Sequence, residues 1–336
     1  PHTYLTLDLN LKGGVRDALR ILNYPYLNYI TLVGMKPENA GGTLTGSFSL
    51  VLPFDDAPVK IGASGTAQNA SMKDVFAGYD VSGATVNVSL ADNVLNLSGE
   101  AMFYGSPATF DVRSSFIDDD PSKLRIAVKS ALKNETRRFF DYGTWLLLPP
   151  AMDGLLKTSM LYEQDRADNS TLSFDFNLKN LKIYWDEIGW IKPPETAGTG
   201  RFVLPFNQGK PQPASFFVVD DSGNRIDGTL MLNEDCDFAG LAVKAKTGRT
   251  DIDGIVSQDG AGDINIVLTG RTLDLADMIH NKDPYADTQN LRPEDIGGGA
   301  DADGGKKPRV TVTAKVDKVW LSQDGVADNT DIYFVY

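Results

Sequence analysis

Apolar and polar side chains alternate in run after run of this sequence. Residues 171–178 show the pattern most clearly, with an apolar phase formed by Leu172, Phe174, Phe176 and Leu178. A period of two residues is typical of a β-strand that buries one face and exposes the other. Because the pattern recurs along most of the chain, it limits the fold to architectures built from sheets.

Roughly fifteen such runs are separated by short segments rich in Asp, Asn, Gly and Pro, which are turn-forming residues. The predicted strands are 3–11, 43–52, 58–68, 81–90, 93–103, 107–117, 123–131, 171–178, 180–186, 200–206, 214–220, 225–233, 238–246, 249–257, 262–270, 310–316 and 326–336. Short connections join antiparallel neighbours, so we expect a long antiparallel meander.

Helical spacing is rare. Residues 15–22 place apolar side chains at the i, i+3, i+4 and i+7 positions of a helix. Shorter helices are predicted at 71–78, 133–143 and 273–280. Residues 283–307 are rich in Gly, Asp and Pro and have no period, so we expect a mobile loop there.

The chain is predicted to contain two β segments, 1–140 and 171–336, joined by a connecting segment at 141–170. Two faint repeats support related halves. One repeat is a strand, a Gly break and a short helix, and it recurs at 9–19, 61–76 and 264–279. The other relates Gly46–Phe54 to Gly198–Phe206.

So few helices cannot cover the apolar faces of so many strands. Three architectures remove those faces from water: a sandwich with a dry core, a closed barrel, or an open trough covered by a hydrocarbon ligand. A phospholipid has on the order of 30 methylenes, and exposing each to water costs about 0.8 kcal/mol. An apolar trough therefore binds lipid without any catalytic residue. The predicted fold class is mostly β, a long antiparallel meander curled into an elongated groove with a few short helices.

Composition excludes several classes. The formal net charge of −13 argues against nucleic-acid binding, which requires clustered Lys and Arg. A single cysteine, Cys236, rules out an internal disulfide framework. No apolar stretch reaches 18 residues, so no transmembrane helix is predicted. Because the sequence starts inside a strand pattern without an initiating Met, we expect a fragment of a longer protein, with any signal or anchor outside it.

Residues for catalysis or metal binding are scarce. The chain has only two histidines, His2 and His280, which excludes a multi-histidine metal site or a histidine-based triad. Acidic clusters at 118–120, 220–221, 301–303 and 324–331 lack the spacing of a calcium loop and are interpreted as solvated turns. We therefore predict a non-enzymatic protein without a metal or other cofactor.

Three stretches resemble a known family. The first is residues 171–206, in which predicted strands flank an Ile-Gly-Trp turn and a Lys-Pro-Pro sequence. The others are Gly270–Leu275 and the Gly-rich strand Gly42–Phe54. Their order is similar to that in AsmA-like proteins of the Gram-negative envelope. The resemblance implies a β-groove in the periplasm that carries phospholipid toward the outer membrane. It also implies neighbouring β segments of the same full-length protein as partners, and an inner-membrane anchor outside this chain.

The candidate groove residues are apolar sets that keep one phase along a strand. They are Leu5, Leu7, Leu9, Val86, Val88, Leu90, Leu172, Phe174, Phe176, Ile264, Ile266 and Leu268. Two alternatives stay open. One is a structural or adhesive surface module with a dry core and no ligand. The other is an enzyme acting on polysaccharide through paired carboxylates, although the sequence singles out no pair.

Overall fold

The computed structural model describes residues 3–22, 36–55, 57–76, 79–103, 105–137, 151–185, 188–259, 262–276, 279 and 309–335. The chain divides into two compact units. Unit 1 comprises Pro1–Ala131 and Ser159–Leu172, and unit 2 comprises Leu132–Thr158 and Ser173–Tyr336. The domain boundaries expected from the sequence stay a prediction. The predicted mobile loop at 283–307 lies outside the described residues.

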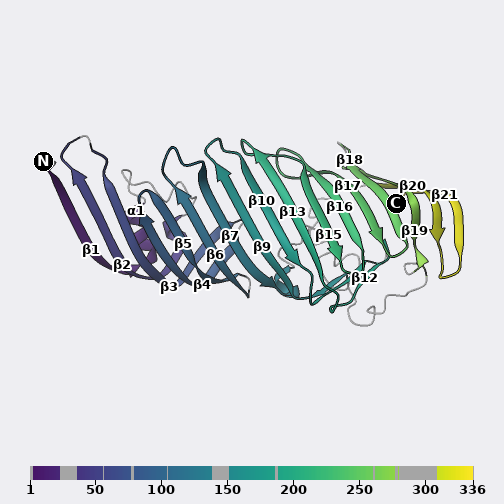
Figure 1. The fold of residues 1–336 in the computed structure, drawn as a ribbon, viewed down its shortest axis with the longest axis horizontal. Helices are drawn as coiled ribbons and strands as arrows, with labels where there is room; N and C mark the ends of the chain where they lie inside the picture. The colour runs from purple at the N-terminus through teal and green to yellow at the C-terminus, as the bar shows by residue number, and fades with distance from the viewer. Residues whose placement is uncertain are drawn as a thin grey trace. The chain divides into compact units, whose positions relative to one another are not determined.

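The described part of the chain is mostly β, which confirms the predicted fold class at that level (Figure 1). Eighteen of its strands belong to one mainly antiparallel sheet, and three form a second, small sheet. The strands of unit 1 are β1 (Tyr4–Gly14), β2 (Ala40–Pro53), β3 (Lys60–Phe76), β4 (Tyr79–Ala91), β5 (Val94–Phe103), β6 (Ser106–Ser115) and β7 (Ser122–Leu132), the last ending one residue inside unit 2. Each pairs antiparallel with the next one in sequence.

Two strands, β9 (Leu156–Asp165) and β10 (Ser170–Asn177), contribute residues to both units. The large-sheet strands of unit 2 are β13 (Gly198–Asn207), β14 (Lys210–Pro211), β15 (Ala214–Asp220), β16 (Arg225–Leu232), β17 (Phe238–Thr247), β18 (Thr250–Gln258), β19 (Ile264–Asp274), β20 (Val310–Trp320) and β21 (Val326–Val335). The small sheet consists of β8 (Met152–Gly154), β11 (Leu181–Trp185) and β12 (Trp190–Lys192).

One pairing departs from the expected meander. β19 and β20 are parallel, with Ile264 opposite Val310 and Ile266 opposite Val312. Parallel neighbours require a crossover that returns the chain to the starting end of the first strand. The sequence connecting β19 to β20 is correspondingly long, as is the one from β1 to β2, which contains α1.

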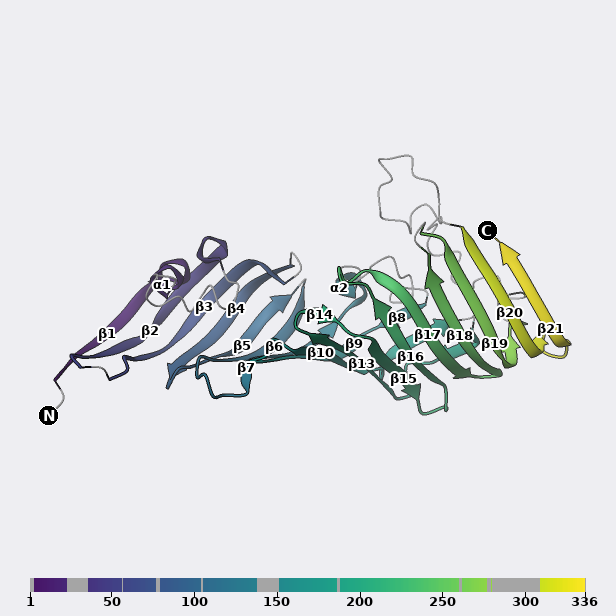
Figure 2. The ribbon, with the colours of Figure 1, turned by 90° about the horizontal axis from the view of Figure 1, so that it is seen from above.

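The helix predicted at 15–22 is confirmed as α1 (Val15–Leu22), which lies against one side of the strands of unit 1 (Figure 2). The side chain of Val15 packs against four small buried residues, Ala67, Ala70, Ala84 and Ala101. Small side chains let a helix approach a sheet closely, and the Nε of Arg16 also donates to the carbonyl of Ala40 at 3.2 Å. The predicted helix at 133–143 is described only in its first part, as α2 (Asn134–Arg137).

The helix predicted at 71–78 is wrong, because β3 continues to Phe76. The register between β3 and β4 shifts three times between Ala67 and Phe76, and Asn69 has a left-handed φ of 49°. Each such irregularity inserts a residue and changes which face the next side chains take. A bulged strand therefore imitates helical spacing. The predicted helix at 273–280 is likewise shorter, since β19 extends to Asp274 and residues 277, 278 and 280 lie outside the described part.

Four hairpin turns share a five-residue design that the sequence analysis did not identify. An Asp or Asn at the first position pairs its backbone N–H with the carbonyl of the fifth residue, and its side chain accepts from the backbone within the turn. The turns are Asp165–Asn169, Asp220–Asn224, Asn233–Asp237 and Asp259–Asp263. These acidic residues are therefore structural groups of turns.

The carboxylate of Asp120 stabilises the turn between β6 and β7. It accepts from Nη2 of Arg113 at 2.6 Å and from the backbone N–H of Ser122 at 3.0 Å. These hydrogen bonds, the one from Arg113 foremost, lower the pKa of Asp120 from 3.8 to about 2. The folded chain thus holds this carboxylate ionised at a pH where the unfolded chain has protonated it.

Replacing Asp120 with asparagine is expected to remove a pH-dependent contribution to stability. The contribution is fully present above pH 3.8 and is lost as the pH falls through about 2. Urea unfolding of both proteins between pH 2 and pH 7 measures it, and the stability difference should shrink in the acid part of that range. A difference that stays constant down to pH 2 would contradict this role.

Within the described residues, no helix has the length and the apolar content needed to cross a membrane.

Candidate functional site

The registers of unit 1 place its apolar side chains on one face. Leu9 lies opposite Phe48, Phe48 opposite Ala63, and Ala63 opposite Leu90, so these side chains share a face across four strands. The face comprises Leu5, Leu7, Leu9, Leu11, Leu44, Phe48, Leu50, Leu52, Ile61, Ala63, Ala67, Val86, Val88, Leu90, Leu95, Leu97, Phe110, Val112, Leu124, Ile126 and Val128. We call it the unit 1 apolar face.

The opposite face of the same strands is polar. Its cross-strand contacts include a hydrogen bond of 3.0 Å between the hydroxyls of Ser47 and Ser64, and one of 3.1 Å from Thr66 to the side-chain oxygen of Asn87. On β6 and β7 it carries ion pairs such as Arg125 with Asp111 at 3.6 Å. A sheet with one solvated face normally packs its other face on a core.

Much of the unit 1 apolar face is only partly buried. Leu5, Leu7 and Leu9 are 52%, 42% and 41% exposed, whereas Leu90 is buried. In the described residues of unit 1, the buried apolar cluster is the small one of alanines beneath α1. Exposed contiguous apolar surface of this kind marks a binding surface more often than an isolated exposed leucine does.

Unit 2 has an apolar face of the same kind. One row of side chains crosses this face from strand to strand, and we call it the outer row. In it Leu230 lies opposite Leu241, and Leu241 lies opposite Val256. The row continues through Ile266, Val312 and Phe334. The face comprises Phe216, Val218, Ile226, Leu230, Leu241, Val243, Ala245, Ile252, Val256, Ile264, Ile266, Leu268, Val310, Val312, Ala314, Val316, Ile332 and Phe334. We call it the unit 2 apolar face.

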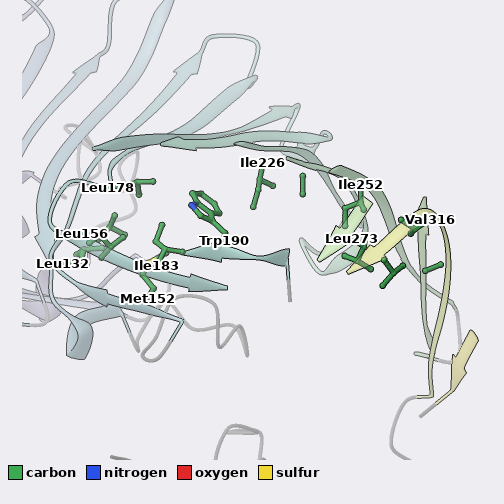
Figure 3. Close-up of a cluster of buried hydrophobic side chains, with 14 residues drawn as sticks. Leu132, Met152, Leu156, Leu178, Ile183, Trp190, Ile226, Ile252, Leu273 and Val316 are labelled. Carbon is green, nitrogen blue, oxygen red and sulfur yellow. The ribbon is translucent and has the colours of Figure 1, made fainter. Parts of the chain in front are cut away.

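The small sheet covers the inner half of the unit 2 apolar face. Trp190 lies between the small sheet and Ile226 of β16 (Figure 3), and together with Ile183 and Leu181 it is fully buried. Ile226, Ala245 and Ile252 belong to the same buried cluster. The outer row from Leu230 to Phe334 does not, and its Phe334 is 54% exposed.

Two residues at the small sheet join it to the large one. Nε1 of Trp190 donates to Oδ2 of the buried Asp220 at 2.7 Å, and the Trp190 ring meets Trp185 edge-on at 5.0 Å between centroids. Nζ of the fully buried Lys192 donates to the carbonyls of Leu178 at 2.7 Å, Leu181 at 2.8 Å and Pro193 at 3.3 Å. Burial lowers the pKa of Lys192, partly offset by the negative charge of Asp220.

A second buried cation lies beside the small sheet. The guanidinium of Arg137 donates to the carbonyls of Leu132, Met152 and Gly154 and to the side chain of Asn134. Burial lowers its pKa as well. Like Lys192, Arg137 satisfies backbone acceptors that the interior would otherwise leave without a donor.

Nine of the twelve predicted groove residues fall on these two faces, and the three on β10 do not. The sets Leu5, Leu7, Leu9 and Val86, Val88, Leu90 share the unit 1 apolar face. Ile264, Ile266 and Leu268 share the unit 2 apolar face. Phe176 packs against the buried cluster of unit 2, and Phe174 stacks on Phe176 at 6.1 Å and meets Phe202 at 6.4 Å. Leu172 has the phase of these two rings on β10 but falls within unit 1. Whether any of these residues lines a lipid groove stays a prediction.

The polar groups of the described residues form no recognisable catalytic constellation. Among those residues, no group of three or more His, Cys, Asp or Glu side chains is arranged to hold a metal ion. His2, His280 and the acidic cluster at 301–303 lie outside the described residues. Cys236 is exposed in the Asn233–Asp237 turn. Asp220 is a buried acceptor for Trp190 and Asn224.

A shallow depression lies on the side of unit 2 that carries Ser215, Thr229 and Lys244, opposite the unit 2 apolar face. Charged residues of both signs border it, among them Arg201, Asp227 and Lys244. Lys244 pairs with Asp253 at 3.3 Å, so charges there are matched across the strands.

Comparison of the chain with protein-family models, with curated proteins and with solved structures found no match.

Sequence reasoning missed the small sheet and its buried cations. The signal lay in the run from Leu181 to Lys192, where two short apolar strands end in Lys-Pro-Pro. Lysine is seldom fully buried, so a lysine two residues after a tryptophan gave no sign of its buried position.

Proposed function

We propose that this chain is a non-enzymatic lipid-binding segment whose two apolar sheet faces take up phospholipid acyl chains. The observation that carries the proposal is an apolar face several strands wide in each unit; the opposite face is polar in unit 1 and mixed in unit 2, where Ile255 and Val267 are exposed. Covering such a face with hydrocarbon removes apolar area from water at about 25 cal/mol per Å². The binding requires no catalytic or metal-ligating group.

We further propose that the chain is an AsmA-like protein of the Gram-negative envelope. In this proposal the sheet curls into an elongated groove in the periplasm and carries phospholipid toward the outer membrane. Neighbouring β segments of the same full-length protein would continue the groove, and an anchor outside this chain would hold it to the inner membrane. The order of Gly-rich strands that resembles this family supports the proposal, as does the long meander.

A structural module with a dry core is the second candidate. The observation that favours it is the small sheet, which fills the inner half of the unit 2 apolar face with Trp190 and Ile183 and leaves no room there for a ligand. If the whole chain were such a module, no lipid would accompany it.

Charged substitutions on the apolar faces should abolish lipid binding without unfolding the chain. The variants are Val88→Asp in unit 1 and Ile266→Asp in unit 2, because both side chains lie partly exposed on an apolar face. The measurement is native mass spectrometry with lipid extraction on protein purified without detergent. Wild type should carry phospholipid in stoichiometric amount, and each variant should lose most of the lipid bound by its unit.

The matched controls are Ser89→Asp and Asn265→Asp, which place the same charge on the neighbouring residue, on the polar face of the same strand. They should retain lipid, and circular dichroism should show all four variants folded. A wild-type chain that is folded and free of lipid would favour the dry structural module. If the variants and the controls lost equal amounts of bound lipid, the assignment of lipid binding to the apolar faces would be wrong.

A further inference from the structure

Among the described residues, β1 is an edge strand of the sheet in unit 1. Its eleven residues, Tyr4 to Gly14, pair with β2 along their whole length without a register shift. Within the described residues of unit 1, β2 is the strand that pairs with it, and Figure 1 shows β1 with β2 on one side only. An unpaired edge presents a row of backbone N–H and C=O groups to another strand.

Several of the usual protections of an edge strand are missing from β1, although its polar side carries Asp8 and Lys12. Proline, a bulge or a very short strand normally prevents pairing. Tyr4–Gly14 contains no proline and no register shift. Nearly every residue of the strand is exposed, including Leu5, Leu7 and Leu9 on its apolar side. A long, regular and exposed edge of this kind favours addition of a further strand.

The polar side of β1 is self-complementary. Asp8 and Lys12 lie at equal distances on either side of Asn10 and point to the same face. When two copies of the strand pair antiparallel around Asn10, Asp8 of each copy stands opposite Lys12 of the other. On the apolar face, the same register places Leu9 of each copy opposite Leu11 of the other. Opposite charges and apolar pairs directly across two strands are both stabilising.

Neighbouring registers match less well. A pairing centred on Asp8 would oppose two carboxylates, which is destabilising. One centred on Leu9 would put Asp8 opposite Asn10 and leave no ion pair. The charge pattern of β1 therefore selects one register, which pairs residues 6 to 14 of the two copies.

We propose that β1 is a dimerisation edge, at which two copies of this chain join antiparallel around Asn10. The two-fold axis stands perpendicular to the sheet, so the unit 1 apolar faces of both copies lie on the same side and merge into one. The contact is isologous and closes at two copies, as is common in homodimers. It does not depend on lipid binding, because it rests on the backbone edge and on the charges of the polar face. It excludes a neighbouring β segment of the full-length protein from β1, so any such segment would continue the groove elsewhere.

A charge-swap experiment tests the proposal. Sedimentation velocity across a concentration series should show the wild-type chain approaching twice the 36.5-kDa mass of one copy. Asp8→Lys and Lys12→Asp, each alone, oppose like charges at two places and should weaken the dimer at least about tenfold. An equimolar mixture of the two variants should restore dimers, because each of the two contacts then joins a lysine of one variant to an aspartate of the other.

Lys129→Asp, which changes the net charge equally on β7, serves as the control and should leave the dimer unchanged. Wild-type chains that stay monomeric at every concentration would overturn the proposal. So would dimers that survive both single substitutions, since association would then occur elsewhere on the chain.

A second measurement locates the two-fold axis. In a Cys236→Ser background, Asn10→Cys places the two thiols opposite each other across the proposed axis, within reach of a short bifunctional thiol reagent. Thr6→Cys places them about eight residues apart along the strand, roughly 27 Å, which is beyond its reach. Efficient cross-linking at residue 10 and not at residue 6 is expected. Equal yields at both positions would contradict the register.

Discussion

Replacing Trp190 with alanine is expected to lower the free energy of unfolding by about 3–5 kcal/mol, the range for deleting a buried large side chain. Trp190 is fully buried at the centre of the cluster that joins the small sheet to β16, β17 and β18. The substitution leaves a cavity there and removes the edge-on contact with Trp185. It also removes the donor that Asp220 accepts from at 2.7 Å.

Urea unfolding followed by far-ultraviolet circular dichroism measures the effect, since tryptophan fluorescence changes with the substitution itself. Ile191→Ala is the matched control. Ile191 is the next residue of β12, points the other way and is 49% exposed, so its loss should change stability by less than about 1 kcal/mol. Similar losses for both variants would mean that the small sheet does not anchor unit 2.

Lys192→Met is expected to cost about 3 kcal/mol, because it leaves buried carbonyls without their charged donor. Methionine matches the length of the lysine stem, so the substitution tests the ammonium group rather than packing. In wild type the Nζ donates to the carbonyls of Leu178, Leu181 and Pro193. Those carbonyls belong to the turns that end β10 and begin β11 and β13. Losing the three hydrogen bonds from Nζ should therefore loosen the small sheet as a whole.

The pH dependence of this variant gives an independent check. Burial lowers the pKa of Lys192 below 10.5, so over the window just below pH 10.5 the unfolded chain binds a proton that the folded chain has released. Stability linked to Lys192 therefore rises with pH in that window. The difference between wild type and Lys192→Met should widen as the pH approaches 10.5. Lys179→Met, at an exposed turn position nearby, should change neither the stability nor its pH dependence.

The two predictions concern the part of the molecule that distinguishes unit 2 from unit 1. Both units have a one-sided apolar face, but the described part of unit 1 covers its face only locally, with α1 over a patch of alanines. Unit 2 covers half of its face with the small sheet, which Trp190 and Lys192 hold in place. If the apolar faces bind lipid, unit 2 offers a narrower surface than unit 1, limited to the outer row that runs from Leu230 through Ile266 to Phe334.

Local pattern was sufficient to predict most strands and α1. The alternation of apolar and polar residues along Ile264–Leu268 or Val86–Leu90 indicates which side chains share a face, because the backbone geometry of a strand fixes a period of two residues. The spacing of Val15, Ala18, Leu19 and Leu22 reported a helix for the same reason. The mostly β class and the candidate apolar sets thus came from the amino-acid sequence.

Local pattern failed where a bulge or a distant partner determines the structure. The bulges in β3 shifted the phase of its side chains and imitated a helix at 71–78. The parallel pairing of β19 with β20 was not visible, because a strand carries no local mark of its partner's direction. Of the four five-residue turns, only Asp220–Asn224 overlaps an acidic cluster that was interpreted as a solvated turn. The hydrogen bonds of all four were not visible in the sequence, since they form between groups that the fold brings into position.

The amino-acid sequence alone established that this protein is built of strands with one apolar and one polar face. The reason is that the alternation of apolar and polar residues is a property of each single strand. Which part of each face is covered was settled by contacts between residues far apart in sequence. Trp190 reaches Ile226, and Lys192 reaches Leu178, only after the small sheet has folded onto the large one. Burial is a property of the assembled layers, and no short stretch of sequence contains both sides of such a contact.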